Sequence, residues 1–244
     1  MKQLAKRLLR RAGYVLQHLP PGLPSGQLLE RDLALVIGPA PRPVCLDVGA
    51  NRGDFVTLLL AHLPQPVIHA FEPAPGPFAI LRQRHAARPG VTLVPAGVGS
   101  APGELPLHLS DNEALNSFLP FAPEGGRTFG GAAQIGRHTA PVVTLDTYAA
   151  DLALARIDLL KIDTQGFDLQ VLRGAQGLLQ AGRIRNVLVE LNFMPLYEGQ
   201  AEAADVIAWL RQHHLHLVDY YEKWRQGPLL GWCTALFTLR PPAP

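Results

Sequence analysis

Two acidic residues and the glycine-rich turn between them could bind a small ligand that carries both a ribose and a positive charge. Asp47 lies in the run LDVGANRGDF, near the end of an apolar stretch, where its carboxylate could hold a cationic amino group. Gly49 and Gly53 then bracket Asn51, and such glycines let the backbone come close to a ligand. Glu72 stands 25 positions after Asp47, where an acid can accept both hydroxyls of a ribose. The alternative for both acids is a turn cap or a surface carboxylate.

A dinucleotide-binding dehydrogenase is the nearest competing interpretation, because it also has a glycine-rich turn and an acid about 20 residues later. Its glycine spacing is G-x-G-x-x-G, whereas this turn has the sequence GANRG and lacks the middle glycine that a pyrophosphate requires. A diphosphate also leaves Asp47 without a function. The glycine spacing therefore disfavours an NAD-dependent oxidoreductase.

Two further carboxylates follow later apolar runs and could serve a group transfer to oxygen. Asp163 comes directly after LLKI, and Glu190 lies in NVLVEL. An in-line displacement needs aligned atoms and a proton acceptor, and one carboxylate near the acceptor is enough. His138 is a competing base because imidazole titrates near neutrality, although an exposed loop histidine is the simpler interpretation. The two acids could also bind Mg²⁺, but no ligand spacing requires a metal, and such acids also serve as helix caps.

These residues require elements that bring them to one edge of a sheet. Short apolar runs alternate with helical patterns, which indicates repeated βαβ units. The predicted strands are residues 44–48, 67–71, 91–95, 158–162, 186–191, 216–221 and 234–239, and the predicted helices are residues 54–62, 77–87, 167–180 and 202–213. Such alternation predicts an α/β fold whose mainly parallel sheet carries helices on both faces, with ligands beyond the carboxyl ends of its strands.

The stretch from Ser110 to Thr139 shows no sustained period and contains two pairs of adjacent glycines. A segment of about 30 residues without regular structure is usually functional or disordered in a compact domain. We predict a lid over the acceptor at about residues 110–139; a mobile loop without a role is the alternative. The chain would then comprise a helical cap at residues 1–43 and a catalytic domain at residues 44–244.

Six stretches, in this order, resemble the FkbM family of methyltransferases: LDVGANRGDF, FEPAPGPF, VPAGVGS, TLDTY, LLKIDTQGFDLQVLRGA and VELNFMPLYEGQ. The resemblance covers roughly residues 44–240. It implies a Rossmann-like class I methyltransferase fold that uses S-adenosylmethionine, with a seven-stranded sheet and one antiparallel strand near the C-terminus. It also implies O-methylation of sugars or polyketide-like products. Other family members carry Glu where Gln165 stands, and Asn116 replaces the first of two serines often found in the loop.

The resemblance assigns cofactor contacts residue by residue. They are Asp47, Gly49, Asn51 and Gly53 at the methionine end, Glu72 at the ribose, and Ala96 and Gly97 near the adenine. The candidate catalytic residues on the acceptor side remain Asp163, then Glu190, then His138.

Composition and charge limit the remaining possible functions and locations of the protein. The 244 residues are 48% apolar, which suits one domain, and the net charge is only +2. Five basic residues lie within the first eleven positions, so the rest of the chain carries about −3 and has no stripe for nucleic acid. No signal-peptide core or membrane-length apolar run is present, which predicts a cytoplasmic protein without stable membrane insertion. The basic N-terminal helix could touch anionic lipid or a partner, although a solvated cap helix is simpler.

Two functions from different classes fit these observations. The first is an O-methyltransferase that acts on a hydroxyl of a sugar, a glycan or a natural-product scaffold. The second is a catalytically weak scaffold or regulatory subunit that only binds the cofactor. Asp163 and Glu190 favour the enzyme, because a scaffold has no need of acids around an empty acceptor site. Trp224 and Trp232 would seal the edge of the core or form a homodimer contact.

Overall fold

The computed structural model describes residue 11, residues 13–14, residue 19, and residues 22–123, 125–128 and 130–239. Apart from Arg11, the predicted basic N-terminal helix lies outside the described residues. No helix in the part of the chain that the structure describes is long and apolar enough to cross a membrane.

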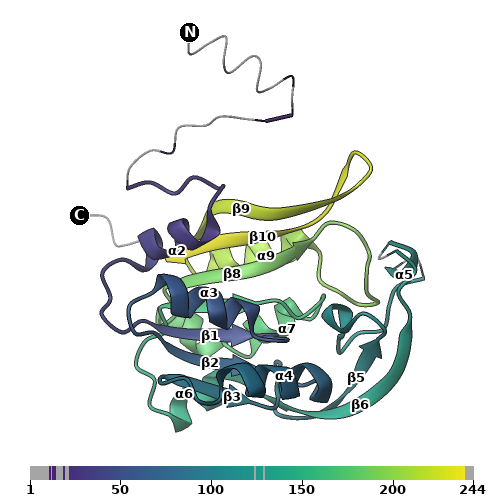
Figure 1. The fold of residues 1–244 in the computed structure, drawn as a ribbon, viewed down its shortest axis with the longest axis horizontal. Coiled ribbons are helices and arrows are strands. Elements are labelled where there is room, and N and C mark those ends of the chain that lie inside the picture. Colours follow the sequence, from purple (N-terminus) through teal and green to yellow (C-terminus); the bar gives the residue numbers. More distant parts are fainter. Residues whose placement is uncertain are drawn as a thin grey trace.

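A seven-stranded sheet forms the centre of the molecule (Figure 1). Its strand order is β3-β2-β1-β7-β8-β10-β9, and only β10 runs antiparallel to its neighbours. The strands are β1 (Val44–Val48), β2 (Val67–Phe71), β3 (Val91–Val94), β7 (Leu159–Ile162), β8 (Asn186–Asn192), β9 (Leu215–Gln226) and β10 (Leu229–Leu239). The predicted mainly parallel sheet with one antiparallel strand is confirmed.

Helices cover both faces of the sheet, which is why its central strands are apolar on both sides. One face packs against α2 (Leu29–Ile37), α3 (Asp54–His62) and α4 (Pro75–His85). The other face packs against α6 (Leu145–Asp151), α7 (Asp168–Arg173), α8 (Gln176–Gln180) and α9 (Ala203–Gln212).

The predicted helix at residues 167–180 is interrupted. It consists of α7 and α8, which are separated at Gly174 and Ala175. A Cβ at Gly174 would lie 2.0 Å from the backbone oxygen of Gly99, so the chain passes this point too closely for any other residue. Tertiary contact, which local periodicity does not report, therefore sets the break.

A second sheet projects beside the first and was not predicted. It has the order β4-β6-β5, with β4 at Gly97–Val98, β5 at Gly103–Ser110 and β6 at Gln134–Val143. The prediction of an unstructured segment at residues 110–139 is therefore wrong in part, because β6 begins at residue 134. Between the strands lie η1 (Glu113–Leu115) and α5 (Gly125–Thr128). The long β5–β6 ribbon and η1 appear at the lower right of Figure 1.

The helix α2 is attached to the far edge of the main sheet. Asp32 is fully buried, and its carboxylate accepts hydrogen bonds from the backbone N–H of Ser25 at 2.7 Å and of Gly26 at 2.9 Å. The Tyr221 hydroxyl of β9 donates to the same carboxylate at 2.9 Å. The helix of the predicted cap that is described thus packs on the main sheet.

Candidate active site

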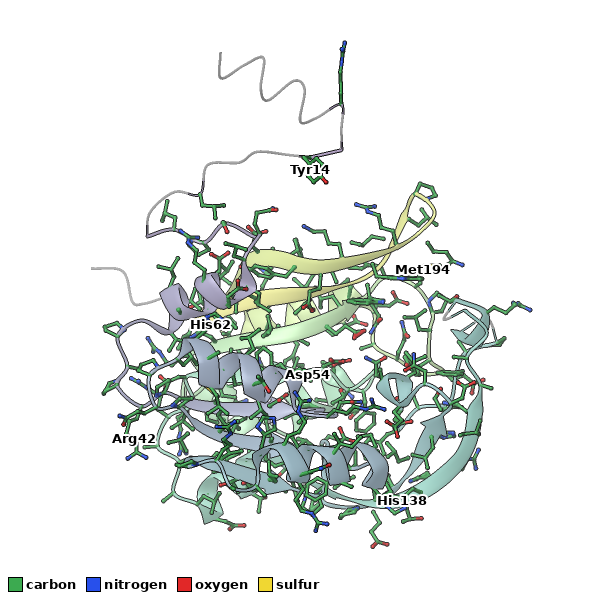
Figure 2. The ribbon with its side chains drawn as sticks, in the orientation of Figure 1. Tyr14, Arg42, Asp54, His62, His138 and Met194 are labelled. Atoms are coloured by element: carbon green, nitrogen blue, oxygen red, sulfur yellow. The ribbon has the colours of Figure 1, made fainter. Side chains whose placement is uncertain are left out.

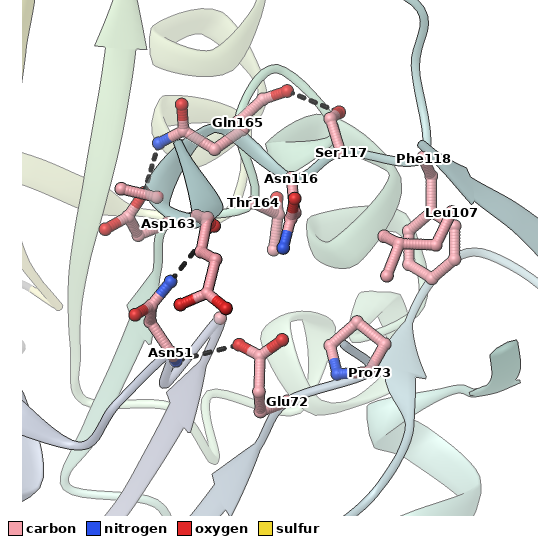
Figure 3. A pocket seen from close by; sticks show the side chains of 13 residues that line it. Asn51, Glu72, Pro73, Leu107, Asn116, Ser117, Phe118, Asp163, Thr164 and Gln165 are labelled. Atoms are coloured by element: carbon pink, nitrogen blue, oxygen red, sulfur yellow. Dashed lines mark hydrogen bonds between the residues drawn. The ribbon is translucent and has the colours of Figure 1, made fainter. Parts of the chain in front are cut away.

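Three adjoining cavities open where β1, β2, β7 and β8 end, and Asp163 and Ala114 line all three. The first cavity lies between the β1–α3 turn and the second sheet (Figure 3). The second cavity, of about 640 Å³, lies beneath the β9–β10 hairpin, and the third, of about 380 Å³, lies beside α3. Volumes of a few hundred cubic ångströms are typical of small-molecule sites.

The β1–α3 turn is drawn tightly over the neighbouring strands. Gly49 and Asn51 both have left-handed backbone conformations, with φ of 77° and 48°. A Cβ at Gly49 would lie only 1.9 Å from the backbone oxygen of Asp163. Only glycine fits there, and the close approach brings the turn against the end of β7. Gly53 lies behind the cavity, where it begins α3 and packs on His85.

Glu72 ends β2 and presents its carboxylate to the first cavity (Figure 3). One carboxylate oxygen accepts the Asn51 backbone N–H and the other accepts that of Ala74, each at 2.8 Å. Burial raises the pKa of Glu72 to about 7, although these two hydrogen bonds oppose the shift. Each carboxylate oxygen has a second lone pair, so the group can still accept hydroxyls from a ligand.

The opposite wall of the first cavity is apolar and includes Pro73, Leu107 and Phe118 (Figure 3). Ala96 and Gly97, expected near the adenine, do not line the cavity. A Cβ at Gly97 would lie 2.4 Å from the Phe118 ring, so this glycine makes room for the ring that does line it. The predicted contact of Ala96 and Gly97 with a ligand stays a prediction.

Asp47 also lies behind the cavity, because its side chain is fully buried and faces Lys161 of β7. The Lys161 Nζ lies 3.0 Å from Asp47 Oδ1 and 3.6 Å from Asp163 Oδ2, and it donates a hydrogen bond to the Gly49 oxygen at 2.7 Å. In this structure the cation that Asp47 contacts is Lys161, and its predicted role of holding a cationic amino group, directly or through water, stays a prediction. Burial would lower the pKa of Lys161, but Asp47 and Asp163 outweigh it and raise that pKa.

Asp163 and Glu190 lie together at the junction of the second and third cavities, as their strand ends predicted. The Gln165 Nε2 donates to Asp163 Oδ1 at 2.8 Å and to Glu190 Oε2 at 3.0 Å. Burial, and then the negative charge of Asp163, raise the pKa of Glu190 well above its usual value. The Asp163 side chain is 43% exposed, so a ligand can reach it. The two acids form a carboxylate pair.

His138 is not part of this arrangement. It lies on β6 opposite Leu107, at the lower edge of the view in Figure 2, and it lines none of the three cavities. Its selection from the sequence depended on a loop position, whereas the residue is fixed in a strand.

Residues 112–118 close the first cavity from above. The Asn51 Nδ2 donates to the Glu113 backbone oxygen at 3.2 Å, and Arg52 forms an ion pair with the Glu113 carboxylate. Ser117 Oγ donates to the Gln165 backbone oxygen at 2.7 Å. This short bridge therefore connects the β1–α3 turn to the turn after β7.

The β9–β10 hairpin supplies the wall of the second cavity that sequence reasoning missed. Trp224 and Trp232, expected at the core edge or a dimer contact, line this cavity together with Glu222 and Thr234. Glu222 has a positive φ of 47° beside a register shift in the hairpin, and it accepts the Thr234 hydroxyl at 3.0 Å. Such bulges often turn a side chain toward a site.

Acids are the charged residues of the second cavity. Asp163, Glu190 and Glu222 line it, and no Lys or Arg is among the described lining residues. Within the described ranges, no group of three or more His, Cys, Asp or Glu side chains is arranged to hold a metal ion.

The family model of the methyltransferase FkbM domain matches residues 47–216. Methyltransferase sdnD of Sordaria araneosa is 35% identical over 61% of this chain and 66% of its own length. The 31-O-demethyl-FK506 methyltransferase FkbM of Streptomyces tacrolimicus is 30% identical over 73% of this chain and 74% of its own.

A solved structure of the METTL16 methyltransferase domain covers 98% of this chain and 79% of its own, with a TM-score of 0.50 and 14% identity, so it shows a likeness of fold alone. The family match extends from the β1–α3 turn to the carboxylate pair and the start of β9, which includes much of the site described above. The chain belongs to the FkbM family of S-adenosylmethionine-dependent methyltransferases.

Proposed function

We propose that this methyltransferase transfers the methyl group to a hydroxyl oxygen of a small molecule or glycan. The observation that carries the proposal is the position of Asp163, which lines all three cavities at their common junction. Cofactor and acceptor must meet at one point for an in-line transfer, and a carboxylate at that point can receive the proton of the hydroxyl.

The first cavity, of about 110 Å³, adjoins the other two at Asp163 and is lined by groups that suit the nucleoside part of the cofactor. Glu72 offers free lone pairs to ribose hydroxyls, and the apolar wall of Leu107 and Phe118 can cover an adenine. The close approach at Gly49 brings the β1–α3 turn against the backbone of Asp163, so a cofactor that lies on this turn also lies beside that residue. When bound, S-adenosylmethionine supplies an electrophilic methyl group on a sulfonium.

The carboxylate pair orients the attacking hydroxyl and takes up its proton. Asp163 accepts the hydroxyl hydrogen bond, while Glu190 has a raised pKa that makes it a stronger base once it is ionised. Lys161 balances the negative charge of the pair. Activity should therefore rise with pH as Glu190 loses its proton.

The second cavity is suited to an acceptor ring with several hydroxyls. Two tryptophans offer flat apolar surfaces, and three carboxylates and two amides offer hydrogen-bonding groups. The relative from Streptomyces tacrolimicus bears a name that specifies O-methylation. A sugar, a glycan or a hydroxylated natural product remains the proposed acceptor class.

Transfer of radiolabel from S-adenosylmethionine to hydroxylated acceptors tests this function. Asp163→Asn keeps the shape of the side chain and removes its charge, so turnover should fall by about 10²–10⁴-fold while S-adenosylhomocysteine affinity stays within a few fold. Asp151→Asn, at an exposed position on α6, is the matched control.

Label found on nitrogen or carbon instead of oxygen would contradict the proposal, as would an Asp163→Asn variant with unchanged turnover. Loss of activity in EDTA that added Mg²⁺ restores would assign the two carboxylates to a metal instead.

A further inference from the structure

Gln165 lies at the centre of a hydrogen-bond network to which the methyl-transfer proposal gives no role. Its side-chain Nε2 contacts Asp163 Oδ1 at 2.8 Å and Glu190 Oε2 at 3.0 Å. Its side-chain Oε1 accepts the Tyr197 hydroxyl at 2.8 Å, and its backbone oxygen accepts the Ser117 hydroxyl at 2.7 Å. One residue thus connects both carboxylates, a buried tyrosine and the bridge over the first cavity.

The orientation of the Gln165 amide follows from its partners. Two carboxylates need donors, and only the amino side of an amide can donate. Tyr197 is 2% exposed, and burial raises the pKa of its hydroxyl, which keeps it protonated and able to donate to the amide oxygen. The amide is therefore fixed at both ends.

The backbone holds Gln165 in place at a conformational cost. Its φ is 54°, a region that non-glycine residues rarely adopt. The buried carboxylate of Asp168 closes this turn by accepting from Thr164 N and from Gly166 N, both at 3.1 Å. A strained residue that is fixed so firmly beside a cavity indicates a positioning function.

We propose that Gln165 is a positioning residue that holds Asp163 and Glu190 together by donating one N–H to each. Two adjacent carboxylates repel each other, and amide donors favour their charged forms. The catalytic function of the carboxylate pair rests on the proposed methyl transfer. The hydrogen bonds that hold the pair together do not depend on that proposal.

Other titratable groups around the pair must be considered in any test based on pH. The titratable groups that face Asp163 and Glu190 are Asp47 on β1, Lys161 on β7, Asp168 on α7, Tyr197 after β8, Glu222 on β9 and Cys233 on β10. These groups are the same in the wild type and in each variant. Their contributions to the pH dependence of stability therefore cancel when a variant is compared with the wild type.

The test compares thermal unfolding of the free full-length protein at pH 5.5 and pH 8.5. Gln165→Leu removes both donors, which raises the pKa of the pair and makes the folded state hold a proton to higher pH. Stability is then lost as pH rises, so the Tm deficit of Gln165→Leu relative to wild type should be larger at pH 8.5 by at least about 4 °C. Gln180→Leu, at an exposed position on α8, should show no such difference.

A second variant separates positioning from packing. In Gln165→Leu/Glu190→Gln only one carboxylate remains, and the new amide can donate to Asp163, so at least half of the additional loss at pH 8.5 should be recovered. The proposal would be overturned if the Tm deficit of Gln165→Leu were equal at both pH values, or if adding Glu190→Gln left that deficit unchanged. Either result would show that Gln165 contributes only packing. Neither readout uses methyl transfer, so this result and the assay of the proposed function can fail independently.

Discussion

At the scale of single residues, the buried charged side chains of the site are stabilised by their hydrogen-bond and ion-pair partners. Lys161 is 8% exposed and lies among Asp47, Asp163 and the Gly49 oxygen. Burial of an isolated ammonium is costly, whereas a lysine with several oxygen partners offsets much of that cost. Lys161 thereby connects the β1–α3 turn to the acid at the junction of the cavities, and it lines the third cavity.

Glu72 provides a residue-scale prediction for pH dependence. In the free protein, burial raises its pKa to about 7, so the neutral form is populated below that pH. Ribose hydroxyls donate to the charged form, so binding should release a proton in this range. Titration calorimetry should show that S-adenosylhomocysteine affinity increases as pH rises toward about 7 and levels off above it.

Glu72→Gln should weaken S-adenosylhomocysteine binding at pH 8 by at least tenfold, or about 1.4 kcal/mol, because the amide keeps only one acceptor oxygen and lacks the negative charge to which the ribose hydroxyls donate. It should also flatten the pH dependence of affinity. Glu104→Gln, at an exposed position on β5, should behave like wild type. If Glu72→Gln bound as tightly as wild type, Glu72 would have to be removed from the cofactor site.

At the scale of elements, the bridge at residues 112–118 should respond to the cofactor. It lines the first cavity and is held by Asn51, Arg52 and Gln165, so a ligand beneath it adds contacts. Amide hydrogen exchange should slow in residues 112–118 when S-adenosylhomocysteine binds, while residues 125–128 of α5 should change less.

If amide exchange slowed equally in residues 112–118 and 125–128, a lid that closes as one unit over residues 110–139 would be favoured. If exchange slowed in neither segment, the cofactor would not lie beneath the bridge.

The elements also show where sequence reasoning succeeded. The boundaries of β1, α3 and β2 agree with the predicted residues 44–48, 54–62 and 67–71, because hydrophobic periodicity reports buried strands and amphipathic helices directly. The second sheet was missed because β5 and β6 pair across more than 20 intervening residues, and neither strand has a clear local pattern.

The topology of the sheet brings five of the predicted site residues to the cavities, whereas residues placed there by irregular backbone were not predicted; the roles of the five stay predictions. Gly49, Asn51, Glu72, Asp163 and Glu190 lie at strand ends or in the first turn, and all line the cavities. Glu222 faces the site only because of a hairpin bulge, and bulges leave no reliable signal in a single sequence.

At the scale of the whole molecule, the fold brings two sheets and a hairpin together around one edge. The main sheet supplies the acids, the second sheet supplies the apolar wall at Leu107, and the hairpin supplies the tryptophans. Asp163 occupies the point where these contributions meet. The central claim is that the reactive end of the cofactor faces this residue.

A crystal structure with S-adenosylhomocysteine tests that claim most directly. We predict that the ribose hydroxyls lie within hydrogen-bond distance of the Glu72 carboxylate and the adenine lies against Phe118. The sulfur atom should lie at the junction lined by Asp163 and Ala114, open to the second cavity. A ligand whose sulfur points away from Asp163, or whose ribose lies outside the first cavity, would contradict the account.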